Sequence, residues 1–331
     1  APATGLDTPG DAPALINYGK WATPKQGDND HHQVIYLSVP AATAGKLYLR
    51  VFDPDTGGAH DQVDKRYLTT ATRFAVFGGP GAFVPGAAGP QELSKDEMTA
   101  GTLLGEKTFR RDRKVDDTWQ TIAELDPGQG TPAGDRIVFR LLVDALTGVN
   151  GNVFDVTMST AADANVAPAG LQVFSYSPTV RMPSRGVLTE VKFLVPPGTK
   201  EVKVGNFDAA FGTVNLDTRF VTYPLVASGQ GDWKETTVEL PADTTEAALT
   251  ISGGREYPND TTFYVIGEDG KLLPFVLPPR ILPLNARPQA VALQDSMGSC
   301  TSVRFAGGLS SDPEGAPLAL RWRFGDGTTA T

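Results

Sequence analysis

Two acidic loops carry the residues of this chain best suited to chemistry. Asp28-Asn29-Asp30-His31-His32 stands just before an apolar segment at 34–39, and Asp53-Pro54-Asp55-Thr56-Gly57-Gly58-Ala59-His60-Asp61 follows another at 46–52. Hard cations such as calcium take about six to eight oxygens from carboxylates and loop carbonyls. If the two segments are antiparallel neighbours, both loops lie at one edge and can converge. The predicted calcium ligands are therefore Asp28, Asp30, Asp53, Asp55 and Asp61.

A structural interpretation of the same loops stays open, because Asp and Gly are also common turn formers and solvated charges. A later stretch of the sequence keeps an equivalent Asp208 but continues with Ala209-Ala210-Phe211. A second site there is less expected, despite Asn215 and Asp217 nearby.

Signs of catalysis are few. The sequence has no Gly-x-Ser-x-Gly elbow, no His-Glu-x-x-His pair and no Walker loop. All three histidines, His31, His32 and His60, lie in the acidic loops, which confines histidine-based catalysis to residues 1–180. A Ser/His/Asp triad stays an alternative, since its members need not be neighbours in sequence. We predict no catalytic residue and interpret the chain as non-enzymatic.

Composition narrows the partners and the compartment. Lys and Arg number 29 against 38 Asp and Glu, a net charge of −9, so the surface repels polyanions and nucleic acid is a poor partner. The single cysteine, Cys300, excludes an internal disulfide and a cysteine-based zinc site. No apolar run approaches the ~18 residues of a membrane span. The start Ala1-Pro2-Ala3-Thr4-Gly5 resembles a secreted chain after signal cleavage, although any trimmed chain would look the same.

Alternating apolar runs of strand length, separated by Pro, Gly and Asp, predict an all-β chain. The expected strands cover 34–39, 46–52, 73–77, 136–143, 153–158, 171–177, 188–195, 201–207, 219–223, 236–240, 247–251 and 262–266. One short helix is expected over 95–104, since Ser94 and Glu97 form a capping box.

The second half of the chain matches the first in order, which predicts an internal duplication. The matched pairs are 34–40 with 191–196, 46–53 with 201–208, 72–77 with 218–223, Trp119 and 122–125 with Trp233 and 236–240, 152–156 with 260–265, and 170–174 with 270–275. Most of the length difference falls between Phe77 and Trp119, which predicts an insertion at about 78–117 in the first copy. We expect two tandem antiparallel β-sandwiches, jelly-roll-like, at residues 1–180 and 181–284, joined by stiff Pro-rich segments.

Other aromatic and basic residues favour structural roles. Trp119 and Trp233 hold equivalent places in the two copies, which indicates a framework role, and packing is also expected for Trp21 rather than a glycan platform. The charged run at 107–117 is interpreted as a solvated loop or helix face, with a patch for an anionic polymer as the alternative.

The last residues change character. Four blocks, 288–292, 303–307, 310–315 and 320–328, closely resemble the first half of a PKD domain, an immunoglobulin-like module, within residues 285–331. Trp322 and Phe324 would face its core, and Gly325-Asp326-Gly327 would form a tight turn. The resemblance implies an extracellular or cell-surface bacterial protein in which such modules act as spacers or as protein and glycan contacts, with catalysis rare.

The sequence thus favours a non-catalytic, secreted or surface-exposed multimodular bacterial protein, located outside the cytoplasm, that acts as a scaffold, adhesion or ligand-presenting module for a protein or glycan. The alternative is a calcium-dependent carbohydrate-binding array, accessory to a larger glycan-degrading enzyme. An enzyme active within residues 1–180 is the third hypothesis.

Overall fold

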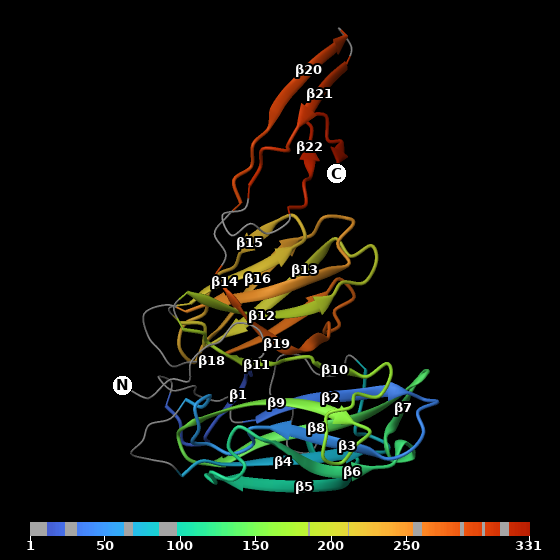
Figure 1. The fold of residues 1–331 in the computed structure, drawn as a ribbon, viewed down its shortest axis with the longest axis vertical. Coiled ribbons are helices and arrows are strands. Elements are labelled where there is room, and N and C mark those ends of the chain that lie inside the picture. Colours follow the sequence, from blue (N-terminus) through green and yellow to red (C-terminus); the bar gives the residue numbers. More distant parts are fainter. Residues whose placement is uncertain are drawn as a thin grey trace.

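The computed structural model shows an elongated all-β protein (Figure 1). It describes residues 12–23, 32–62, 69–85, 98–184, 186–210, 212–253, 260–284, 288–299, 302–311 and 318–331. Within this part of the chain, no helix is long and apolar enough to cross a bilayer.

The strands fall into three groups along the chain. The first group is β1 (Leu15–Tyr18), β2 (His32–Pro40), β3 (Leu47–Phe52), β4 (Ala71–Gly78), β5 (Thr102–Arg110), β6 (Trp119–Leu125), the 3-10 turn η1 (Pro127–Gln129), β7 (Thr131–Ala133), β8 (Arg136–Thr147), β9 (Gly151–Ser159) and β10 (Gln172–Ser175). The second is β11 (Thr179–Arg181), β12 (Val187–Leu194), β13 (Glu201–Phe207), β14 (Thr213–Thr218), β15 (Thr222–Pro224), β16 (Trp233–Glu239), β17 (Glu246–Ser252), β18 (Asp260–Gly267) and β19 (Phe275–Pro283). The third is β20 (Leu293–Ser299), β21 (Ser302–Ala306), β22 (Trp322–Arg323) and β23 (Thr329–Ala330).

The first two groups share two large sheets. One sheet has the order β16-β13-β18-β11-β1-β9-β3-β6, and the other has the order β15-β14-β17-β12-β19-β10-β2-β8-β4-β5, with β7 paired to β8. Antiparallel pairing joins the groups twice, with Leu15 opposite Val180 and Phe174 opposite Val276. Each sheet therefore runs without a break from one half of the molecule into the other.

The order of strands outward from this joint is the same in both directions. β1-β9-β3-β6 corresponds to β11-β18-β13-β16, and β10-β2-β8-β4-β5 corresponds to β19-β12-β17-β14-β15. The two halves therefore share one order of neighbouring strands.

One hydrophobic core lies between the two sheets and extends through both halves. In β3, Leu47, Leu49 and Val51 alternate inward and are fully buried, as the period of two requires. Phe74 of β4 and Phe154 of β9 meet edge to face across the sheets, with ring centroids 5.5 Å apart. The same contiguous cluster includes residues of both groups of strands, so the halves share their apolar contacts.

Two local expectations are wrong in part. Residues 98 and 99 are helical, as predicted, but residues 102–104 of the predicted helix begin strand β5, which pairs with β4; residues 95–97 lie outside the described residues. The predicted strand at 219–223 is interrupted, since β14 ends at Thr218 and the backbone N–H of Thr218 bonds the carbonyl of Val221 in a turn. The place of β4 is taken in the second half by β14, because its buried Val214 and Leu216 supply the inward side chains.

The tryptophans divide into two kinds. Trp119 packs on Phe52 with ring centroids 5.6 Å apart, and Trp233 packs on Phe207 at 5.1 Å, each across a paired position of neighbouring strands. Trp21, expected to pack, is 60% exposed, because it follows the end of β1 rather than lying within a sheet.

The final group forms two hairpins at the tip in Figure 1. Phe305 and Trp322 approach to 5.7 Å between ring centroids. The Gly327 N–H bonds the Phe324 carbonyl at 3.0 Å, and Gly327 adopts φ 86, so the predicted tight turn at 325–327 is present.

The continuous sheets predict that the two halves unfold together. Val180→Asp would place a carboxylate in the fully buried joint between β1 and β18, at a cost of about 3 kcal/mol or more. Val276→Asp is the control, since Val276 lies on joint strand β19 but is 44% exposed, and its effect should stay within about 0.5 kcal/mol. Calorimetry should give one main transition, shifted down only by Val180→Asp. Two separate transitions, with only one of them moved, would contradict the shared core.

Candidate metal centre

Asp53 begins the loop at 53–62 with an unusual backbone. It follows β3 with φ 51, in the left-handed region that Asp tolerates better than most residues. Its own N–H bonds the carbonyl of Thr118 at 3.0 Å. Further along, the backbone of Gln62 exchanges hydrogen bonds with Gly151, and Asn152 donates from Nδ2 to the Pro54 carbonyl at 2.8 Å. The loop is thereby fastened to the start of β9.

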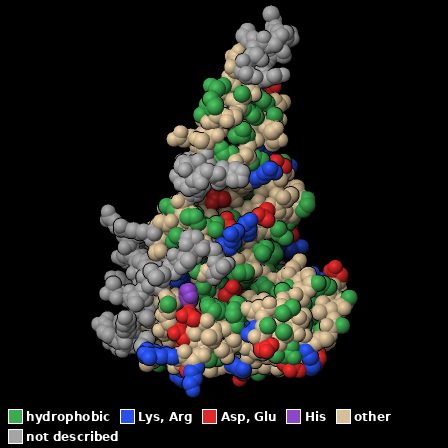
Figure 2. All heavy atoms as spheres, viewed as in Figure 1, with side chains coloured by type: hydrophobic (Ala, Val, Ile, Leu, Met, Phe, Trp, Pro, Cys, Tyr) green, Lys and Arg blue, Asp and Glu red, His purple; other side chains and the backbone are tan. Residues whose placement is uncertain are grey.

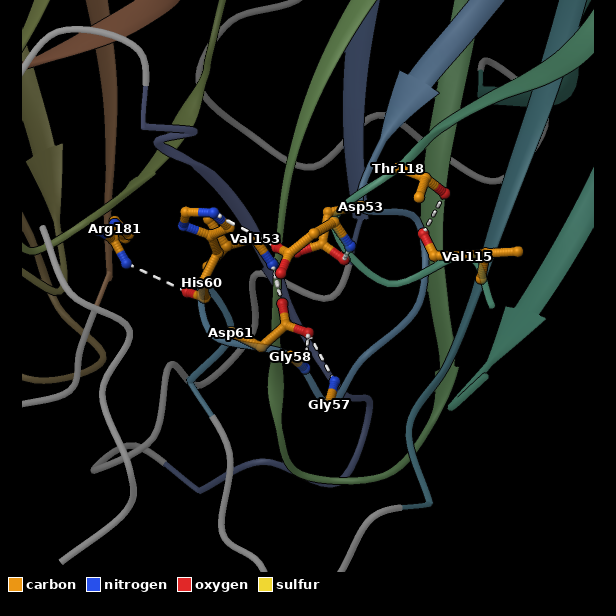
Figure 3. Close-up of polar contacts among 10 residues, drawn as sticks. Asp53, Gly57, Gly58, His60, Asp61, Val115, Thr118, Val153 and Arg181 are labelled. Atoms are coloured by element: carbon orange, nitrogen blue, oxygen red, sulfur yellow. Dashed lines mark hydrogen bonds and ion pairs between the residues drawn. The ribbon is translucent and has the colours of Figure 1, made fainter. Parts of the chain in front are cut away.

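Asp61 holds this loop in shape. Its Oδ2 accepts the N–H groups of Gly57 at 2.6 Å and Gly58 at 3.4 Å, and its Oδ1 accepts the N–H of Val153 at 2.7 Å (Figure 3). The side chain is fully buried. Both carboxylate oxygens are thus engaged with backbone donors, which assigns Asp61 a structural part in the loop.

A second loop, at 112–117, closes over the first. Asp55 accepts the N–H of Asp112 at 2.7 Å, and Asp53 accepts the N–H of Asp117 at 3.1 Å through Oδ1. The Asp116 side chain lies against Gly58, and a Cβ atom added at Gly58 would lie only 1.8 Å from the Oδ1 of Asp116. Glycine at 58 therefore leaves the space that the Asp116 carboxylate occupies.

Three carboxylate oxygens in this acidic cluster, which comprises Asp53, Asp55, Asp116 and Asp117, are buried without a hydrogen-bond partner. They are Asp53 Oδ2, Asp55 Oδ1 and Asp116 Oδ1. Carboxylate oxygens of Asp53, Asp116 and Asp117 all lie within 4.8 Å of one another. Asp117 is 46% exposed and its Oδ1 lies 3.3 Å from His60 Nε2, so the cluster is closed at Asp53 and open at Asp117.

Burial and mutual repulsion disfavour the ionised carboxylates. Burial, with the neighbouring charge of Asp61, raises the pKa of Asp53 to about 9, and burial raises the pKa of Asp55 to about 6. The pKa values of Asp61 and Asp116 are also raised, mainly by burial. A bound divalent cation would favour the ionised forms and supply a partner for the unpaired oxygens.

The structure brings together three of the five predicted ligands. Asp53, Asp55 and Asp61 share the loop at 53–61, whereas Asp28 and Asp30 lie outside the described residues. Sequence reasoning missed Asp116 and Asp117, which belong to the run interpreted as a solvated loop. No local pattern could have found them, because their approach depends on the pairing of Phe52 with Trp119, which places the residues just after one beside the residues just before the other.

In the second half, the loop after β13 begins with the same backbone conformation as the loop after β3, but Asp208 lacks the neighbouring acids. Asp208 adopts φ 56 and accepts the N–H of Gly231 at 3.1 Å, as Asp53 accepts that of Asp117. Ala209 and Ala210 follow it, and both are buried. Among the described residues, the only group of three potential metal-binding acids is in the first half.

On the face shown in Figure 2, basic and acidic side chains are interspersed, and acids gather beside a histidine in the lower part. The view shows no extended basic surface.

Comparison with known proteins identifies the C-terminal module. A family model described as PKD domain matches residues 285–331, which indicates a module of extracellular, multimodular proteins. No curated protein matches this chain significantly. A solved structure of Cowpea mosaic virus top component, naturally occurring empty particles, aligns at 10% identity over 86% of this chain and 94% of its own, with a TM-score of 0.18. That likeness is too weak to support any statement about this protein.

The raised pKa values predict an unusual pH response in the metal-free protein. A carboxyl group whose pKa rises on folding from 3.8 to about 9, as for Asp53, stabilises the fold fully only below its unfolded pKa, and that contribution is lost as the pH rises. In EDTA, the melting temperature should fall between about pH 5 and about pH 8, and Asp53→Asn should flatten this dependence. Exposed Asp163→Asn is the control and should keep the wild-type slope. Equal slopes for wild type and Asp53→Asn would show that Asp53 ionises normally.

Proposed function

We propose that this chain is a non-catalytic extracellular scaffold that holds a PKD module and its neighbours at a fixed spacing for contact with a surface protein or glycan. The observation that carries the proposal is the PKD match at the end of two sandwich halves whose sheets are continuous. Shared hydrogen bonds and a shared core resist bending at the joint, which suits a spacer. The arrangement in Figure 1 places the hairpins of the PKD segment at the far tip.

Contacts between the PKD segment and the second half of the molecule support the same function. Arg321 of the PKD segment pairs with Asp243, Nη1 to Oδ1 at 3.3 Å, and its guanidinium lies 5.3 Å from the centre of the Phe220 ring. Arg219 lies over the same ring at 5.0 Å. The Arg321 side chain is only 16% exposed, so the contact is partly shielded from solvent. This contact would orient the module on the second half.

The absence of catalysis is part of the proposal. His60, a described histidine of the acidic loops, directs Nε2 to Asp117, and its backbone carbonyl accepts a bond from Arg181. A nucleophilic serine would instead need a histidine positioned as its base. These contacts favour a structural use of His60.

Small-angle X-ray scattering of the full chain tests the scaffold. Arg321→Ala should broaden the distribution of interatomic distances, because the module loses its ion pair and cation–π contact. Arg323→Ala, on the neighbouring exposed arginine, is the matched control and should leave the profile unchanged. A wild-type profile as broad as that of Arg321→Ala would argue against a rigid spacer. Hydrolysis of a polysaccharide, ester or peptide that is lost in His60→Ala would favour the enzyme hypothesis instead.

A second candidate function is calcium-dependent carbohydrate binding, which one observation favours. Phe52, Trp119 and His60 form a partly exposed aromatic group beside the acidic cluster, with centroid distances of 5.6 Å from Phe52 to Trp119 and 6.0 Å from Phe52 to His60. A sugar ring can pack on an aromatic face while its hydroxyls bind a nearby cation. The second half has the tryptophan but lacks the acids.

This difference gives a matched test on a glycan array. If the candidate is correct, Trp119→Ala should lose at least about tenfold in affinity, roughly 1.4 kcal/mol, and EDTA should abolish binding to the same glycans. Trp233→Ala should retain wild-type binding, since Trp233 has no acidic cluster beside it. Equal losses in both variants would indicate a framework role for both tryptophans. No binding in either calcium or EDTA would exclude this candidate and leave the scaffold proposal unaffected.

A further inference from the structure

We propose that the loops at 53–61 and 112–117 form one calcium site, with Asp53, Asp116 and Asp117 as side-chain ligands and Asp55 as a flanking carboxylate, and that the bound ion stabilises the joint through Arg181. This inference does not depend on the scaffold or glycan function. It replaces the ligand set expected from the sequence by one that spans two loops. The two loops are separated by strands β4 and β5 in the chain.

The unpaired oxygens indicate a cation rather than an ordinary turn. Asp53 is fully buried, and Oδ1 holds the N–H of Asp117 while Oδ2 has no partner. Asp55 has the same division, with Oδ2 on the N–H of Asp112 and Oδ1 unpaired. Leaving a buried charged oxygen unpaired is strongly unfavourable. Carboxylate oxygens of Asp53, Asp116 and Asp117 lie within 4.8 Å of one another, and the charge of Asp116 also acts on Asp55.

The donor set favours calcium over other metals. The grouped atoms are carboxylate oxygens of three aspartates, which suit hard cations. Zinc and copper prefer sulfur and imidazole nitrogen, and this group contains neither. Calcium also accepts irregular geometry with variable coordination number, which two irregular loops can supply more readily than the strict octahedron of magnesium.

Arg181 connects this site to the second half of the molecule. Its Nη1 donates to the carbonyl of His60 at 3.1 Å, and its side chain is fully buried (Figure 3). Arg181 ends β11, the strand that pairs with β1 on one side and with β18 on the other. A change in the order of the loop at 53–61 therefore reaches a buried residue at the joint. A ligand that binds only the folded state stabilises the structure that forms its site. Calcium should therefore protect β11 as well as the loop.

Calorimetry of the full chain, stripped with EDTA and then dialysed, tests the ligand set. Calcium chloride should raise the melting temperature of wild type, and magnesium chloride should raise it much less. Asp53→Asn and Asp116→Asn should each weaken calcium binding, measured by isothermal titration, at least about tenfold, or 1.4 kcal/mol. Exposed Asp163→Asn should bind as wild type does. Asn has nearly the size and shape of Asp and is neutral, so Asp53→Asn should fold well in EDTA, and loss of its calcium response cannot be attributed to misfolding.

Several results would overturn the site. They are no calcium binding at millimolar concentration, an equal response to magnesium, or calcium binding that is unchanged in Asp53→Asn and Asp116→Asn. In each case the two loops would not be the calcium site described here.

Hydrogen exchange tests the connection through Arg181. In wild type, calcium should slow amide exchange in the loop at 53–61 and in β11 and β18. Arg181→Lys retains the charge and Arg181→Met retains much of the volume, and in either variant calcium should still protect the loop while its effect on β11 and β18 is reduced. Unreduced protection of β11 and β18 in a folded variant would overturn the role of Arg181 and leave the ligand set standing.

Discussion

Backbone hydrogen bonds across the joint, between β1 and β11 and between β10 and β19, determine how the rest of the molecule is arranged. Strands at a sheet edge expose unpaired N–H and C=O groups, and each half would have two such edges here. Pairing the edges satisfies these groups and aligns the two halves. It also brings the inner faces of both halves into one core, so the two sandwiches are joined directly rather than by a flexible linker.

The acidic cluster depends on the same frame. Pairing of Phe52 with Trp119 brings the end of β3 beside the start of β6, and the loops at 53–61 and 112–117 extend from those two points. In the second half, pairing of Phe207 with Trp233 produces the same meeting of loops, with the same positive φ at Asp208. The two halves thus share the same backbone conformation at Asp53 and Asp208, but the side chains that follow these residues differ. The first loop pair holds six aspartates, four of them in the acidic cluster, and two alanines follow Asp208 in the second.

Buried carboxylates can hold loops together only when their oxygens find hydrogen-bond donors or a cation. Asp61 shows the satisfied form, with three backbone donors on its two oxygens. Asp53 and Asp55 are each satisfied on one oxygen only, and this asymmetry distinguishes residues that shape a loop from residues that face a ligand. Asp117, at the open side, pairs with His60, whose ring lies 6.0 Å from that of Phe52, and Phe52 in turn packs on Trp119. An ion there would therefore lie close to a surface suited to recognition. A stabilising ion and a binding surface are therefore compatible in one place.

The sequence by itself determined the strand character and the PKD segment. Alternation of apolar residues with a period of two is a local pattern, and runs such as 201–207 were predicted with the bounds that β13 has. The four PKD blocks are local as well, and the family match agrees with them. Local patterns were less accurate at 95–104, where residues 98 and 99 are helical, as the capping box predicts, but residues 102–104 belong to β5.

Only the tertiary structure decided which acids meet and how the halves join. Asp53 and Asp116 are far apart in sequence, and their approach depends on the pairing of β3 with β6, which no local pattern specifies. The engagement of Asp61 with backbone N–H groups likewise depends on how the loop turns at Gly57 and Gly58. Continuity of the sheets rests on edge-to-edge pairing between distant strands. These features arise from contacts between residues distant in sequence, whereas composition and periodicity report only on neighbours along the chain.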